Sequence, residues 1–96
     1  MEVLVAYDVS TDTAAGRRRL RRVAKVCEGH GQRVQKSVFE CILNAAEMEQ
    51  LKHRLRREID LDEDSLRIYR LREPRDRYLQ VIGRQPQFDI RDPLVL

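Results

Sequence analysis

The sequence predicts a small α+β domain in which two helices pack on one face of a four-stranded antiparallel sheet. Three observations support this prediction. Segments with alternating or continuous apolar character and segments with helical spacing follow one another as strand, helix, strand, strand, helix, strand. Right-handed crossovers turn that order into one sheet. The 96 residues suffice for one domain. This βαββαβ order is the ferredoxin-like arrangement, which we assign to residues 1–83, with residues 84–96 as a C-terminal tail that contacts a second copy.

The first strand, within residues 2–8, organises the rest of the chain. Its apolar residues point to both faces of the sheet: Val3, Val5 and Tyr7 to one, Leu4 and Ala6 to the other. Two helices can cover only one of these faces. The second apolar face therefore predicts a symmetric homodimer, sheet against sheet.

The first helix follows a loop in which Asp12 or Thr13 can cap the first turn. Residues at helical spacing form its buried stripe: Gly16, Leu20, Val23, Ala24 and Cys27. Glycines at 29 and 31 end it. We expect it to be about 24 Å long, at about 1.5 Å per residue.

Residues 32–43 are rich in strand formers and too long for one typical strand, so we expect two strands with a bend or bulge around residues 36–38. Phe39, Cys41 and Leu43 alternate onto one face. Asn44 and Glu47 then form a capping box for the second helix, which ends at the acidic segment 60–64. Residues 65–71 alternate as a fourth strand, and residues 78–83 are a fifth strand candidate that could add to the partner's sheet.

Positive charge is concentrated in one part of the chain. The net charge is only +3, but residues 17–36 hold eight basic residues and one acid, a local balance of +7. Such a block favours contact with a nucleic-acid backbone, and the alternative is a solvated helix face. Aromatic residues make up 5% of the chain, which gives little support to recognition by base stacking. The candidate nucleic-acid contacts are Arg17, Arg18, Arg19, Arg21, Arg22, Lys25, Arg33 and Lys36.

Asp8 is the candidate metal ligand, because it is a carboxylate at the end of a buried strand. A single carboxylate cannot hold a metal ion by itself. Mg²⁺, however, binds proteins through one or two carboxylates when waters and substrate phosphates supply its other ligands. A dimer axis near the strand's end would bring two copies of Asp8 together, and the ion could activate water for phosphodiester hydrolysis. The alternative is that Asp8 orders the loop after it. Ser10 could assist at this site or cap the loop, and Tyr7 has a core position.

The sequence gives no support for a cysteine metal site, a hydrolase triad, a nucleotide-binding motif or a membrane span. Cys27 and Cys41 lack metal-binding spacing and look like small core residues. No Ser-His-Asp pattern, Walker loop or dinucleotide glycine motif is present. We find neither a signal peptide nor a stretch approaching the ~20 apolar residues of a membrane span, so we expect a cytoplasmic protein without membrane contact.

The sequence resembles the CRISPR-associated protein 2 family in three segments. They are Val5-Ala6-Tyr7-Asp8-Val9-Ser10, Gly16 to Leu20, and Gly31 to Cys41 with its Gln-Lys-Ser-Val-Phe-Glu run. The tail around Ile82-Gly83, Asp89 and Pro93-Leu94 is similar to the type I-C form. Lys36 departs from the pattern, since many relatives have an uncharged residue there.

The resemblance implies a ferredoxin-like homodimer that acquires spacers together with the CRISPR adaptation integrase. It also implies metal-dependent endonuclease activity on RNA or double-stranded DNA. On this basis Asp8 matches the metal-binding aspartate and Tyr7 its neighbour, Arg17 and Arg19 match first-helix arginines, and Arg33 and Phe39 match a second-strand pair associated with activity.

Three functions therefore compete. In the first, the chain is a Mg²⁺-dependent phosphodiesterase that acts through Asp8, with double-stranded DNA or single-stranded RNA as its partner. In the second, it is a non-catalytic dimeric adaptor that bridges DNA between integrase subunits. The third, a regulatory module for a small ligand, is disfavoured by the basic block.

Overall fold

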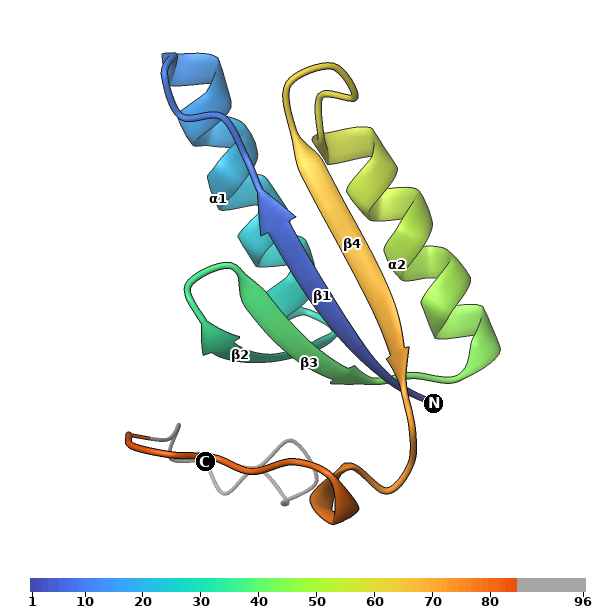
Figure 1. Cartoon of the computed structure of the whole chain (residues 1–96). Helices are drawn as coiled ribbons and strands as arrows, with labels where there is room; N and C mark the ends of the chain where they lie inside the picture. Colours follow the sequence, from blue (N-terminus) through green and yellow to red (C-terminus); the bar gives the residue numbers. More distant parts are fainter. Residues whose placement is uncertain (85–96) are drawn as a thin grey trace, which may run out of the picture.

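The computed structural model describes residues 1–84 and shows the predicted order of elements (Figure 1). The elements are β1 (Glu2–Asp8), α1 (Ala14–Glu28), β2 (Gly31–Gln35), β3 (Val38–Ile42), α2 (Ala45–Glu58), β4 (Ser65–Leu71) and a 3-10 turn η1 (Arg75–Arg77). The prediction of two strands within residues 32–43 is confirmed, because a turn separates β2 from β3 and the register shifts between Arg33 and Gln35.

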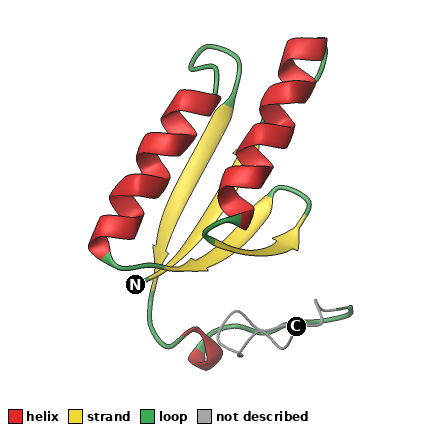
Figure 2. Cartoon of the chain, turned by 180° about the vertical axis from the view of Figure 1, so that it is seen from behind, coloured by secondary structure: helices red, strands yellow, loops and turns green. Residues whose placement is uncertain are grey.

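The four strands form one antiparallel sheet in the order β2-β3-β1-β4. The strand with apolar residues on both faces, β1, lies inside the sheet between β3 and β4. Both helices cover the same face (Figure 2). The other face carries no helix among the described residues, as the α+β ferredoxin-like prediction requires.

The core lies between the helices and the sheet. Val3, Val5 and Tyr7 of β1 are buried there, and Phe39 and Cys41 of β3 lie beside them. The helices contribute Val23, Cys27, Leu51 and Leu55. Burial raises the pKa of Cys27 to about 12 and that of Cys41 to about 11, so both thiols stay protonated and act as small apolar residues.

Local signals in the sequence set the helix starts. Thr13 rather than Asp12 caps α1, because its side chain accepts a hydrogen bond from the backbone N–H of Gly16 at 3.0 Å. Asn44 and Glu47 form the predicted capping box of α2. At Gly31 a Cβ would stand 2.3 Å from the carbonyl oxygen of Glu40, so only glycine lets β2 approach β3 this closely.

The C-terminal predictions are less fully tested. Residues 78–83 form no strand in the described single chain, and the pairing of this segment with a partner's sheet stays a prediction. The tail assigned to residues 84–96 lies outside the described residues except for Arg84. Within residues 1–84, none of the helices has the length and apolar character needed to cross a lipid bilayer.

Candidate nucleic-acid and metal site

Asp8 ends β1 on the sheet face that carries no helix. It pairs in register with Ser65 of β4, and its side chain is exposed. Alternation along β1 puts Asp8 on the same face as Leu4 and Ala6, opposite to the buried Tyr7. The carboxylate is therefore available to solvent at the end of an internal strand of the sheet.

The loop that follows Asp8 is held by the carboxylate of Asp64, whose side chain is fully buried. This carboxylate accepts hydrogen bonds from the backbone N–H of Ser10 at 3.1 Å and that of Asp60 at 2.8 Å. It also accepts one from Nε of Arg19 at 2.9 Å. One side chain thus ties together the β1–α1 loop, the helix α1 and the α2–β4 loop.

Two further contacts fix the same loop. A Cβ on Gly16 would stand 2.0 Å from the carbonyl oxygen of Ser10, so the loop rests directly on the helix backbone. Arg17 donates from Nη1 to the carbonyl oxygen of Thr11 at 3.2 Å. The backbone beside Asp8 is therefore positioned by its surroundings and does not depend on a bound ligand.

Burial alone would raise the pKa of Asp64, but the hydrogen bonds from Arg19, Asp60 and Ser10 outweigh it and lower that pKa below its ordinary value. A carboxyl with a lowered folded pKa stabilises the fold above its unfolded pKa, and this stabilisation is lost as the pH falls through the folded pKa. The clamp that Asp64 makes is therefore intact at neutral pH.

One chain offers an incomplete metal site. Among residues 1–84, no group of three or more His, Cys, Asp or Glu side chains could hold a metal ion. The exposed carboxylate of Asp8 fits Mg²⁺ as one ligand among waters and phosphate oxygens, which is the chemistry that this ion prefers.

The basic side chains divide into two groups. Exposed cations along α1 form what we call the basic ridge: Arg17, Arg18, Arg21, Arg22 and Lys25. Arg19 differs, because its guanidinium pairs with Asp64 at 2.9 Å and with Glu63 at 3.7 Å and its side chain is only 17% exposed. This geometry gives Arg19 a structural task, and its contact with nucleic acid stays a prediction without geometric support.

Tyr7, Arg33 and Phe39 come together on the helix-covered side of the sheet. The rings of Tyr7 and Phe39 stack at 6.2 Å between centroids, and the guanidinium carbon of Arg33 lies 5.1 Å from the centroid of Phe39. Burial raises the pKa of Tyr7, and the nearby Arg33 only partly offsets this effect. Arg33 also faces Glu28 at 3.6 Å.

The predicted site residues therefore lie on two sides of β1. Asp8 is on the open side, while Tyr7, Arg33 and Phe39 are on the helix side, since neighbouring residues of a strand point to opposite faces. Ser10 lies in the loop after Asp8, where its backbone N–H donates a hydrogen bond to the carboxylate of Asp64. Lys36 is exposed in the β2–β3 turn. The sequence reasoning missed Asp64, and the only signal for it was its place in the acidic segment 60–64.

Comparison with known proteins agrees with this geometry. A family model described as CRISPR associated protein Cas2 matches residues 1–78. The chain is 60% identical to a protein of Moorella thermoacetica named CRISPR-associated endoribonuclease Cas2 1, over the whole of both chains. It is 48% identical to the CRISPR-associated endonuclease Cas2 of Halalkalibacterium halodurans, over 99% of each. The crystal structure of Streptococcus pyogenes Cas2 superposes with a TM-score of 0.78 at 53% identity, covering 86% of this chain and all of that one.

The position of Asp64 generates a stability prediction. We expect Asp64→Asn to lower the midpoint of thermal unfolding by several degrees at pH 7, because the amide cannot neutralise Arg19 and presents one acceptor oxygen in place of two. We also expect the variant to lose less stability than the wild type between pH 5 and pH 2. Circular dichroism across this pH range measures both effects.

The matched control is Glu63→Gln. Glu63 contacts the same arginine, but at 3.7 Å and from a side chain that is 57% exposed, so its loss should leave the unfolding midpoint unchanged. Equal effects of the two substitutions would show that Asp64 does not clamp the loop.

Proposed function

The chain belongs to the CRISPR-associated Cas2 family, and we propose that it is a spacer-acquisition subunit with metal-dependent endonuclease activity on RNA or double-stranded DNA. The observation that carries the proposal is the exposed carboxylate of Asp8, on a rigidly held strand end of a chain whose first helix carries a basic ridge. The names of the relatives, endoribonuclease and endonuclease, support this chemistry.

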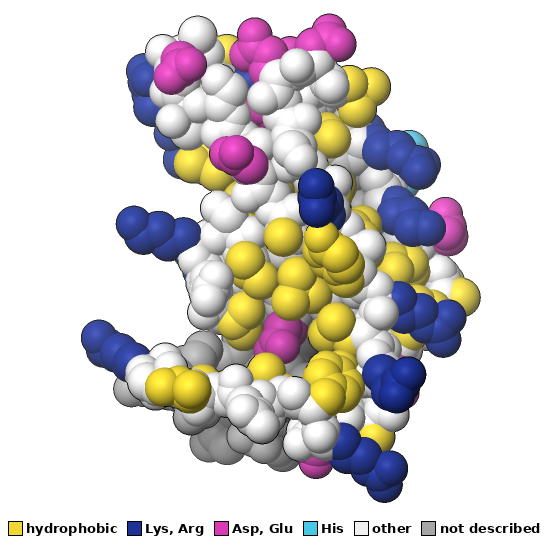
Figure 3. All heavy atoms as spheres, in the orientation of Figure 1, with side chains coloured by type: hydrophobic (Ala, Val, Ile, Leu, Met, Phe, Trp, Pro, Cys, Tyr) yellow, Lys and Arg dark blue, Asp and Glu magenta, His cyan; other side chains and the backbone are white. Residues whose placement is uncertain are grey.

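A homodimer would complete the metal site. We define the open face as the apolar side chains that the register puts on the helix-free side of the sheet: Leu4, Ala6, Val38, Ile42, Tyr69 and Leu71. Figure 3 shows hydrophobic side chains gathered over this face. Ile42 is 38% exposed and Tyr69 46%, so a second copy would remove considerable apolar area from water. Since Asp8 ends the strand that crosses this face, a two-fold axis there would bring in a second Asp8.

Each set of residues would have its own task in cleavage. Two copies of Asp8 would hold Mg²⁺, which when bound would supply an activated water and a polarised phosphate. The basic ridge would hold the backbone through charge, without reading sequence. Asp64 and Gly16 would keep the loop beside Asp8 in place.

A second candidate function is a non-catalytic adaptor. In this form the dimer would bridge a DNA fragment between subunits of the CRISPR adaptation integrase, and Asp8 would be dispensable. The lack of any group of three or more possible ligand side chains within residues 1–84 favours this candidate, because one chain does not by itself assemble a full set of protein ligands for a metal ion.

The dimer proposal predicts a specific response to charge on the open face. We expect wild-type protein to sediment as a dimer at micromolar concentration, and Ile42→Asp to shift it toward the monomer by at least ten-fold in dissociation constant. Leu61→Asp is the matched control, because Leu61 is 79% exposed on the α2–β4 loop outside the open face. A wild-type protein that sediments as a monomer would rule out the completed metal site.

The metal role of Asp8 predicts a selective loss. We expect Asp8→Asn to reduce Mg²⁺-dependent cleavage of RNA and duplex DNA to background while DNA binding persists, because the amide is a poor ligand for Mg²⁺. Asp12→Asn changes an exposed acid of the same loop and should cleave normally. Spacer acquisition in cells by the Asp8 variant separates the two functions: normal acquisition supports the adaptor, and its loss supports the enzyme.

The basic ridge predicts a change in salt dependence. Replacing Arg17, Arg18, Arg21 and Arg22 with alanine should weaken duplex binding. It should also reduce the slope of log affinity against log salt by up to about 3.6, at about 0.9 for each of four lost phosphate contacts. Replacing Lys52, Arg54, Arg56 and Arg57 of α2 removes the same charge and should change the slope much less. Equal slopes in the two variants would show that the ridge is only a solvated helix face.

A further inference from the structure

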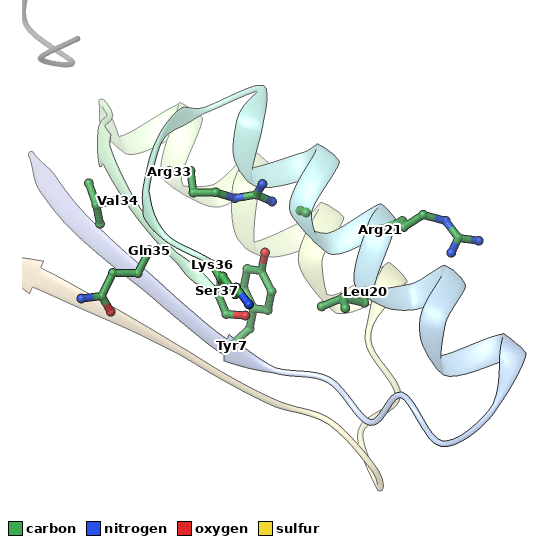
Figure 4. Close-up of a pocket in the computed structure, with 9 residues that line it drawn as sticks. Tyr7, Leu20, Arg21, Arg33, Val34, Gln35, Lys36 and Ser37 are labelled. Carbon is green, nitrogen blue, oxygen red and sulfur yellow. The ribbon is translucent and has the colours of Figure 1, made fainter. Parts of the chain in front are cut away.

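The helix-free side of the sheet, where Asp8 ends β1, carries little positive charge of its own. The basic ridge belongs to α1, which covers the other side. Figure 4 shows Arg21 and Arg33 on that other side as well, around a cavity of about 570 Å³ between α1 and β2. These cations can hold a nucleic-acid strand along the molecule, but they do not share a face of the sheet with the carboxylate of Asp8.

One strand arginine does share that face. The register pairs Asp8 with Ser65 and Ala6 with Arg67, and residues that oppose each other in a sheet point to the same side. Among the residues of the four described strands, Arg67 is the one Lys or Arg that register and alternation place on the helix-free side. Figure 3 shows this side, with hydrophobic side chains in the middle and most of the basic ones around the margin.

The guanidinium of Arg67 is held in place but is not neutralised. The side chain is exposed, and its Nη1 donates a hydrogen bond to the hydroxyl of Tyr69 at 3.1 Å. Within residues 1–84, neither Arg67 nor Asp8 forms an ion pair. A guanidinium has five N–H donors in a planar fork, so the remaining ones can bind an anion that offers two acceptor oxygens.

The spacing of the strands sets Arg67 and Asp8 apart. Arg67 lies diagonally to Asp8, two positions beyond Ser65, and such a placement separates the Cα atoms by roughly 7–8 Å, within reach of a long side chain. Because the two opposite charges lie on one face without pairing, there is room for a further group between them. A phosphodiester fits this place, since it can face a metal ligand on one side and a guanidinium on the other.

Charge balance gives this cation a task at the candidate site. Two carboxylates of Asp8, one from each copy of the proposed dimer, would cancel the two positive charges of one Mg²⁺. The negative charge of a phosphodiester, and the charge that develops on it during cleavage, would then lack a counter-charge. A guanidinium on the same face supplies one, because a fixed cation stabilises developing charge most where water is excluded.

We propose that the guanidinium of Arg67 binds a phosphodiester of the nucleic-acid backbone beside the carboxylate of Asp8. The inference rests on the proposed function, because it adds a phosphate contact to the same candidate site. It extends that site from β1 onto β4. It also separates the phosphate at the site from the phosphates that the basic ridge would hold on the other side of the sheet.

Duplex binding, measured by fluorescence anisotropy over a range of salt concentrations, tests the contact. The buffer contains Ca²⁺, which shares the preference of Mg²⁺ for oxygen ligands. Arg67→Ala should weaken binding at least five-fold and reduce the slope of log affinity against log salt by about 0.9 for each lost phosphate contact. Arg70→Ala is the matched control, because Arg70 is an exposed arginine of the same strand, three positions away and therefore on the other side.

Arg70→Ala should change the affinity less than two-fold and leave the slope unaltered. Equal losses in the two variants would show a general attraction between the protein's charge and DNA, and they would overturn the proposal. Arg67→Lys should recover most of the slope, since an ammonium still binds phosphate as a point charge.

Two further measurements locate the contact. In an Asp8→Asn background, the effect of Arg67→Ala on duplex affinity should fall below two-fold, because both side chains act on the same phosphate in the wild type. A full five-fold effect in that background would place the contact elsewhere and contradict the proposal. Sedimentation of Arg67→Ala should give the dimer dissociation constant of the wild type within two-fold. A ten-fold weaker dimer would show instead that Arg67 contacts the second copy.

Cleavage separates this inference from the proposed function. With Mg²⁺ and saturating protein, Arg67→Ala should cleave at least ten-fold more slowly than the wild type, and Arg70→Ala should cleave at the wild-type rate. If the wild type cleaves and Arg67→Ala is equally fast, the proposal is overturned. If the wild type does not cleave, the endonuclease function fails, and the affinities and salt slopes of the two arginine variants still decide whether Arg67 holds a phosphate.

Discussion

The buried carboxylate of Asp64 is the interaction on which the site depends. It stands just before β4, which pairs with β1, and it receives hydrogen bonds from Ser10, Asp60 and Arg19. The buried negative charge of Asp64 is tolerated because the guanidinium of Arg19 and the backbone N–H groups of Ser10 and Asp60 surround it. The consequence is a loop whose shape is set before any ligand arrives, so the carboxylate of Asp8 is presented by a preorganised backbone.

The unequal covering of the sheet gives the two sides different roles. On the helix side, burial of Val3, Val5 and Tyr7 supplies the stability of a small domain. On the open face, the apolar residues remain accessible in one chain and are suited to a second copy. The strand β1 contributes to both sides through simple alternation, and it thereby links the core, the open face and the candidate metal ligand.

Cations of the first helix have separate tasks although they follow one another in the sequence. Arg19 faces Asp64 and joins two loops to the helix, while Arg18 remains exposed on the ridge. Arg21 lies at the outer rim of a cavity of about 570 Å³ between α1 and β2. Because successive helical residues are rotated by about 100°, five basic residues in one segment reach three different environments. Net charge alone therefore overstates how many of them can meet a nucleic-acid backbone.

The sequence by itself determined the order of elements, the capping box of α2, the split of residues 32–43 and the core side of β1, and it narrowed the cap of α1 to Asp12 or Thr13. These depend on local spacing and capping chemistry, which act over a few residues. Only the tertiary structure decided that Arg19 pairs with Asp64 across 45 positions, that the backbone at Gly16 rests on Ser10, and that Phe39 lies beside both the ring of Tyr7 and the guanidinium of Arg33. Such contacts follow from how the crossovers bring distant segments together, and no short-range pattern encodes them.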